Sequence, residues 1–74
     1  MSSTEKKTLP DYMTILGWGI TELARQARID YKTARRAYYG ETIRGRAARD
    51  IAEAISYALG EQVNVGDIEG LHYQ

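Results

Sequence analysis

Cationic and aromatic side chains recur along one arc of a predicted helix in the middle of the 74-residue chain. If residues 30–40 form an α-helix, with about 100° between successive residues, three cations and two aromatic rings fall on one arc. These residues are Tyr31, Lys32, Arg35, Arg36 and Tyr39. Arginine and lysine bind phosphate oxygens and guanine edges, and tyrosine can contact a thymine methyl group or a phosphate. The pattern favours a polyanion-binding surface, and the alternative is a solvated helix face.

The charges of the chain sum to zero, but they are segregated along the sequence. Residues 25–49 hold eight Lys or Arg and two acidic residues, a net charge of +6, whereas residues 50–74 hold five acidic residues and no Lys or Arg. Such asymmetry is a recognised hint of a polyanion partner. The zero net charge therefore does not argue against nucleic acid.

Composition excludes several other classes of protein. With no cysteine and one histidine, neither a disulfide framework nor a metal site is expected. No nucleophile–base pair, phosphate-cradling glycine loop or carboxylate dyad stands out, so we expect no enzyme activity and no cofactor. The longest apolar run is far below the roughly 20 residues of a membrane span, and the polar N-terminus lacks a signal peptide's apolar stretch. We expect one soluble, cytoplasmic domain.

The clearest helical pattern covers residues 46–59, and Gly60 is its C-cap candidate. Small and aliphatic side chains fall on one continuous arc of this helix. They are Ala47, Ala48, Ile51, Ala52, Ala54, Ile55, Ala58 and Leu59. On the other arc, Arg46 and Asp50 stand four residues apart, as do Arg49 and Glu53, so we expect two ion pairs.

Three shorter helices are predicted before this one. Asp30 is the N-cap of the helix that carries the cationic arc, and Gly40 ends it in the left-handed conformation. Thr21 is the N-cap candidate of a helix that reaches about residue 28. A further helix starts at Thr8, with a proline in its first turn.

The last part of the chain gives a weaker pattern. Val63 and Val65 alternate with polar residues and favour a short extended piece, whereas Asn64 is a candidate cap for a last short helix. Together these elements predict an all-α fold, a compact bundle of four to five helices over residues 8–74. A flexible N-terminal segment over residues 1–7 is expected to precede it.

Residues 20–40 resemble the helix-turn-helix of the phage repressor/Cro family, the xenobiotic-response-element-type regulators. Leu23-Ala24 matches the Leu-Ala of the first motif helix, Ile29 the aliphatic residue after the turn, and Gly40 the glycine after the recognition helix. Residues 50–60 resemble the helix that follows in the family. The resemblance covers roughly residues 8–71, and it implies a lambda-repressor-like bundle.

The sequence departs from the family pattern in the motif itself. Arg28 stands where the family usually has glycine, so the turn is expected to take a costlier backbone conformation or a shifted geometry. Ala34 stands where valine or isoleucine usually fills the core, so the two motif helices are expected to pack more closely. The fourth helix is about one turn longer than usual.

The resemblance implies sequence-specific binding of double-stranded DNA by a small transcription regulator, with the recognition helix (about 31–39) in the major groove. Tyr31, Lys32 and Arg36 match the positions that reach base edges, and the alternative is that all three contact only phosphate. The expected contacts to the DNA backbone are Thr21, Thr33, Arg35, Arg44 and Arg46. For the threonines the alternative is helix capping, and for Arg35 it is solvation. Arg25 and Arg28 are expected to face solvent, and the alternative is that they too flank the DNA backbone.

Modules of this type usually bind palindromic operators as dimers, so a homodimer is expected on DNA. The acidic C-terminal third is the candidate dimer surface, through Val63, Val65, Ile68, Leu71 and Tyr73. Two rival functions remain open. One is an antitoxin or a recombination-accessory, excisionase-like DNA-binding protein. The other is a protein-interaction module whose basic face binds an acidic partner.

Overall fold

Capping residues set where the first helix begins in the computed structural model, which describes residues 6–74. α1 (Leu9–Leu16) starts with a capping box: Thr8 Oγ1 accepts a hydrogen bond from the Asp11 amide (3.2 Å), and the Asp11 carboxylate accepts one from the Thr8 amide (3.1 Å). Gly17, with φ +74°, ends the helix. The predicted helix start at Thr8 is confirmed.

α2 (Ile20–Ala27) has Gly19 as its N-cap, two residues before the predicted cap at Thr21. The assignment of Thr21 as the cap was wrong. Ile20 packs against the core, and its place inside the helix aligns it with Leu23 and Ala27, three and seven residues later. Thr21 therefore lies in the first turn, exposed to solvent.

α3 (Tyr31–Tyr38) follows after a three-residue connection and is capped as predicted. The Asp30 carboxylate accepts a hydrogen bond from the Thr33 amide (3.1 Å). At the other end Gly40 takes a φ of +79°, and the Glu41 amide donates to the Arg36 carbonyl (2.8 Å). The cationic arc is exposed and the alanine side is buried, as the helical pattern predicts.

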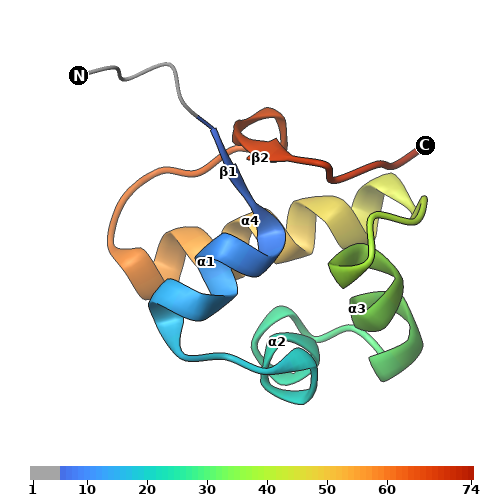
Figure 1. The fold of residues 1–74 in the computed structure, drawn as a ribbon, viewed down its shortest axis with the longest axis horizontal. Coiled ribbons are helices and arrows are strands. Elements are labelled where there is room, and N and C mark those ends of the chain that lie inside the picture. Colours follow the sequence, from blue (N-terminus) through green and yellow to red (C-terminus); the bar gives the residue numbers. More distant parts are fainter. Residues whose placement is uncertain (1–5) are drawn as a thin grey trace.

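α4 (Gly45–Leu59) is the longest helix, and it ends at Gly60, with φ +76°. It crosses behind α1 in Figure 1 and packs against α2. Most of its predicted apolar arc is buried or half-buried, but Ala58 is exposed. The two expected pairs were wrong: among residues 6–74, no ion pair joins Arg46 to Asp50 or Arg49 to Glu53. These side chains are long and lie near solvent, so little energy favours one paired geometry.

The C-terminal segment folds back over the bundle. A 3₁₀ turn, η1 (Val65–Asp67), is capped by Asn64, whose amide donates to the Asp67 carboxylate (3.0 Å). Strand β2 (Ile68–Glu69) then pairs in parallel with β1 (Lys7–Thr8), with Lys7 opposite Ile68. Figure 1 shows this pair above α1. Asn64 thus caps a short helix, as one of the two alternatives had it, but this helix is a single 3₁₀ turn and ends before Ile68.

The described residues form an all-α fold of four α-helices around one core, with a minimal two-stranded sheet. Within those residues no helix is both long and apolar enough to cross a bilayer. Residues 1–5 of the expected flexible segment lie outside the described part of the chain, and Lys7 belongs to β1.

The proposed dimer surface is largely part of the chain's own core, so that prediction was wrong in its residues. Val63, Ile68 and Leu71 are buried against the helices, and Val65 is half-buried. A bundle of this size has little apolar surface to spare, so its last apolar residues cover the core instead of a second chain. Tyr73 alone of the set is exposed.

Candidate nucleic-acid interface

α3 presents its charged face outward because its other face is packed closely against α2. Ala34 and Ala37 of α3 are buried, as are Ala24 and Ala27 of α2. Alanine side chains let two helix backbones approach each other, so α3 is held against a neighbouring helix instead of projecting on a loop. Figure 1 shows α3 at one side of the molecule, with nothing from the described chain covering its outer face.

The five residues of the cationic arc are all exposed. Tyr31 and Tyr39 expose 51% and 60% of their surface, so both rings are accessible on this face. The Arg35 guanidinium lies over the Tyr39 ring, 5.3 Å from its centroid, and the Tyr38 ring meets Tyr39 edge-on at 5.1 Å. These contacts limit the motion of Arg35 and Tyr39 at the end of the helix.

Arg36 is the one residue of this arc that forms an ion pair within the described residues. Its Nε lies 4.0 Å from Glu41 Oε1, and both side chains are more than half exposed. The backbone hydrogen bond from the Glu41 amide to the Arg36 carbonyl places the two residues side by side. Because the pair is exposed and long, it leaves Arg36 free to exchange Glu41 for another acceptor.

The start of α3 carries a fixed negative charge. Hydrogen bonds from the Thr33 side chain and amide hold the pKa of the Asp30 carboxyl below its ordinary value, and the nearby Lys32 ammonium adds to the effect. Thr33 thus serves helix capping, the alternative considered for it. Its predicted contact to a DNA backbone stays a prediction.

Three of the five predicted backbone-contacting residues lie around one surface depression. Thr33 comes from α3, Arg44 precedes α4, and Arg46 lies in the first turn of α4. Arg28, for which solvent exposure was favoured over a contact to the DNA backbone, lines the same depression. The sequence feature that could have singled out Arg28 is its position at the end of a helix, where glycine is usual. Thr21 and Arg35 lie outside this group.

The backbone around Arg44 is fixed by the end of the chain. The Ile43 amide donates to the His72 carbonyl (2.9 Å), and the Gln74 amide donates to the Ile43 carbonyl (3.1 Å). On the other side of Arg44, the Gly45 amide donates to the Gln74 carbonyl (2.8 Å). Nothing in the sequence pattern indicated this pairing, which joins residues far apart in the chain.

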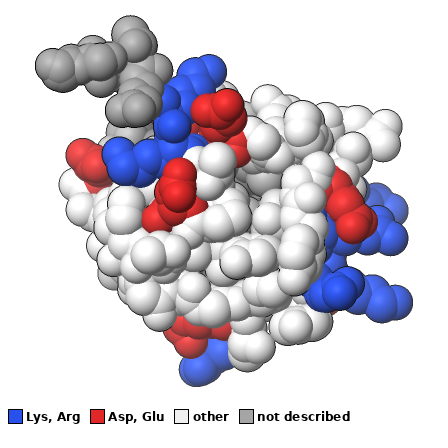
Figure 2. Space-filling model, viewed as in Figure 1, with Lys and Arg blue, Asp and Glu red and all other residues white. Residues whose placement is uncertain are grey.

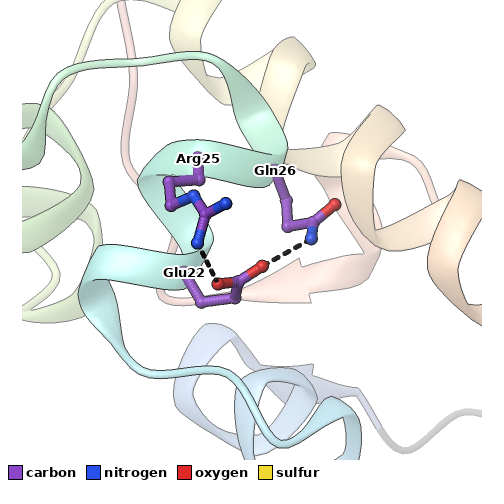
Figure 3. A network of polar contacts seen from close by, with 3 residues as sticks. All are labelled: Glu22, Arg25 and Gln26. Carbon is purple, nitrogen blue, oxygen red and sulfur yellow. Dashed lines mark hydrogen bonds and ion pairs between the residues drawn. The ribbon is translucent and has the colours of Figure 1, made fainter.

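Arg25 differs from the arginines of the depression because it has a partner on its own helix. Its Nη1 lies 3.4 Å from Glu22 Oε1, and Gln26 donates to the other oxygen of the same carboxylate at 2.6 Å (Figure 3). The Glu22 carboxylate is thus bound by two side chains of its own helix. Arg25 therefore offers a cation that is balanced locally.

Cationic side chains gather at one edge of the molecule. In Figure 2 the front is mainly uncharged, and Lys and Arg atoms lie at the edge where α3 and the start of α4 are found, with acidic atoms beside them. A second cationic group lies near β1. Burial, and then the charges of Asp67 and Glu61, raise the pKa of the Tyr12 hydroxyl.

Comparison of the chain with protein-family models, with curated proteins and with solved structures found no match. What the chain binds must therefore be inferred from its own residues. Those residues form one exposed cationic and aromatic helix face, and beside it a depression lined by three arginines.

Proposed function

We propose that the chain binds double-stranded DNA in a sequence-specific manner, with α3 in the major groove, and acts as a small repressor/Cro-like transcription regulator. One observation carries the proposal: a short helix, packed on alanines against α2, exposes three cations and two tyrosines on its outer face. A major groove admits one helix, and its walls are phosphates while its floor presents base edges. α2 and α3 form the helix-turn-helix in this proposal.

Base edges are read by Tyr31, Lys32 and Arg36 in this arrangement. Lysine and arginine suit the O6 and N7 acceptors of guanine, and the tyrosine ring suits a thymine methyl group. Contacts to the sugar–phosphate backbone come from Thr21, Thr33, Arg35, Arg44 and Arg46. Thr21 lies in the first turn of α2, where free backbone amides and the positive end of the helix dipole suit a phosphate.

The proposed regulator acts in the cytoplasm as a homodimer on a palindromic operator. Two recognition helices about 34–36 Å apart match half-sites one helical turn apart. Because most apolar residues of the C-terminal part are buried in the core, the surface that joins the two copies lies elsewhere. Sedimentation of the protein with a palindromic duplex tests this point, and a one-to-one complex contradicts it.

Selection of bound sequences from a pool of random duplexes tests the main proposal. We expect a consensus to emerge and the selected duplex to bind at least about 1,000-fold more tightly than random duplex at physiological salt. Competition between the two duplexes separates DNA reading from attraction of a basic face to any acidic partner. Equal binding of selected and random duplex contradicts sequence-specific reading, and absence of duplex binding contradicts the proposal as a whole.

A further inference from the structure

Arg28 has a backbone conformation that this chain otherwise gives to glycine. Among residues 6–74 a positive φ occurs at Arg28 (+59°) and at four glycines, two of which are helix C-caps as Arg28 is. A side chain in this region brings its Cβ close to the following carbonyl oxygen, so glycine would be the less strained residue. An arginine in such a place suggests a use for its side chain.

The position of Arg28 relative to other cations suggests that use. Arg28, at the end of α2, lines one depression together with Arg44 and Arg46, at the start of α4. Asp30 and Asp50 line it too, but no guanidinium of the three lies within 4.0 Å of a carboxylate of the described residues. The depression is therefore lined by three arginines and two aspartates, and none of these arginines forms an ion pair within the described residues.

We infer that Arg28, Arg44 and Arg46 together bind a phosphodiester group of the DNA backbone, an inference that rests on the proposed function. Guanidinium groups donate paired hydrogen bonds to phosphate oxygens and need no proton exchange to do so. The anion relieves the repulsion among the three cations. The site lies beside the connection between α2 and α3, so a phosphate held there fixes how α3 enters the groove.

The inference is specific to this chain because it assigns a role to a strained residue. Arg44 is held on both sides by hydrogen bonds to residues 72–74, so its backbone cannot shift toward a ligand. Arg28 is held equally firmly, because its amide donates to the Ala24 carbonyl and its conformation is fixed by the turn. The backbone that carries Arg28 and Arg44 is therefore in place before DNA arrives, and binding has to order only the side chains.

Salt titration of four variants tests the inference, with a random-sequence duplex of about 20 base pairs, long enough for two half-sites. Arg28→Gln removes the charge, Arg28→Lys keeps it, and Arg28→Gly removes both charge and strain. Arg25→Gln is the matched control, because it removes a cation from the same helix that already has Glu22 as its partner. Fluorescence anisotropy gives Kd at each KCl concentration, and thermal unfolding gives Tm for every variant.

We expect Arg28→Gln to release about one counterion fewer than the unaltered protein when it binds duplex. When salt rises from about 50 to about 200 mM, the fold-loss of affinity should therefore be about 3.5 times smaller for Arg28→Gln than for the unaltered protein. Arg28→Gly should show the same shallow dependence while its Tm rises. Arg28→Lys should keep most of the slope, and Arg25→Gln nearly all of it. Loss of affinity together with a gain in Tm would separate a binding role from a structural one.

Several outcomes would overturn the inference. Equal slopes for Arg28→Gln and Arg25→Gln would mean that Arg28 acts only through long-range charge. An effect of Arg28→Gln on selected but not on random duplex would make it a base reader. If inorganic phosphate displaced duplex better than chloride at equal ionic strength, and did so equally from the unaltered protein and from Arg28→Gln, Arg28 would take no part in binding phosphate. Failure of the unaltered protein to bind any duplex would refute the proposed function itself, which distinguishes the two.

Discussion

Replacement of Arg36 and of its partner Glu41 tests whether α3 reads bases. In the free protein the two side chains lie 4.0 Å apart and expose 63% and 62% of their surface. Unit charges at that distance attract by about 1 kcal/mol in water, and exposed pairs contribute about 0.2–1 kcal/mol after side-chain entropy and screening. A bidentate contact to guanine is worth about 1–3 kcal/mol of discrimination, so Arg36 gains by leaving Glu41.

Two opposite effects follow from these magnitudes. Arg36→Ala should weaken binding to the selected duplex by about 5- to 150-fold, the equivalent of about 1–3 kcal/mol, with a much smaller effect on random duplex. Glu41→Gln should strengthen binding by up to about 5-fold, because Arg36 no longer has to break an ion pair and one negative charge leaves the phosphates' vicinity.

A double-mutant cycle separates these two causes of the Glu41→Gln gain. If the gain comes from the release of Arg36, it should vanish when Arg36 is already alanine. Any gain that survives measures repulsion between Glu41 and DNA phosphates, and this part should shrink at high salt. Fluorescence anisotropy with selected and random duplex at two salt concentrations supplies all the values. Arg25→Ala controls for the loss of one surface cation.

Two results would refute the reasoning. An equal loss for Arg36→Ala on selected and random duplex would mean that Arg36 contacts only the DNA backbone. Weaker binding of Glu41→Gln would mean that the pair orients Arg36 for binding instead of competing with it. In that case the loss should also vanish in the Arg36→Ala background.

Three further predictions concern binding and stability. Arg44→Ala should weaken binding to all duplexes and, in a salt titration, reduce the slope of log K against log salt by about 0.9. An unchanged slope, with affinity lost only for duplexes that carry one particular base pair, would contradict a phosphate contact. Ser56→Ala should lower the free energy of unfolding in urea by about 1–3 kcal/mol, because Ser56 Oγ accepts from the Val63 amide (2.8 Å) and lies 2.9 Å from the Val63 carbonyl. An unchanged urea midpoint would mean that water replaces the hydroxyl. The pKa of Asp30 is lower in the folded than in the unfolded chain, where it is about 3.8, so the stabilisation is present above that pH and is lost as pH falls through the folded pKa. Asp30→Asn should therefore flatten the pH dependence of the free energy of unfolding in this acid range. An unchanged pH dependence there would contradict the role of Asp30.

Local signals in the sequence predicted most helix boundaries. Thr8, Asp30 and Gly60 each act within a few residues of their own position, through a cap or a left-handed turn. The same holds for the two faces of α3, since helical periodicity alone decides which side chains lie opposite the alanines. For this reason the set of side chains that α3 exposes could be predicted without a structure.

Features that depend on distant parts of the chain could not be predicted in this way. Val63, Ile68 and Leu71 are apolar whether they cover the chain's own core or a second copy, and only tertiary contacts distinguish the two. The hydrogen bonds that fix Arg44 come from residues about thirty positions later, and they follow no periodic pattern. The convergence of Arg28 with Arg44 required the packing of α2 against α4.

The alanine contact between α2 and α3 links the fold to the proposed function. Each helix has eight residues, too short to be stable alone in water, so each depends on the other for its structure. Ala34 is fully buried, and α3 packs against α2. Because a densely packed core resists relative motion of its elements, the outer face of α3 has a fixed position relative to Arg28 and α4. A fixed distance between a groove-reading helix and a phosphate site is what lets contacts to the backbone set the register in which bases are read.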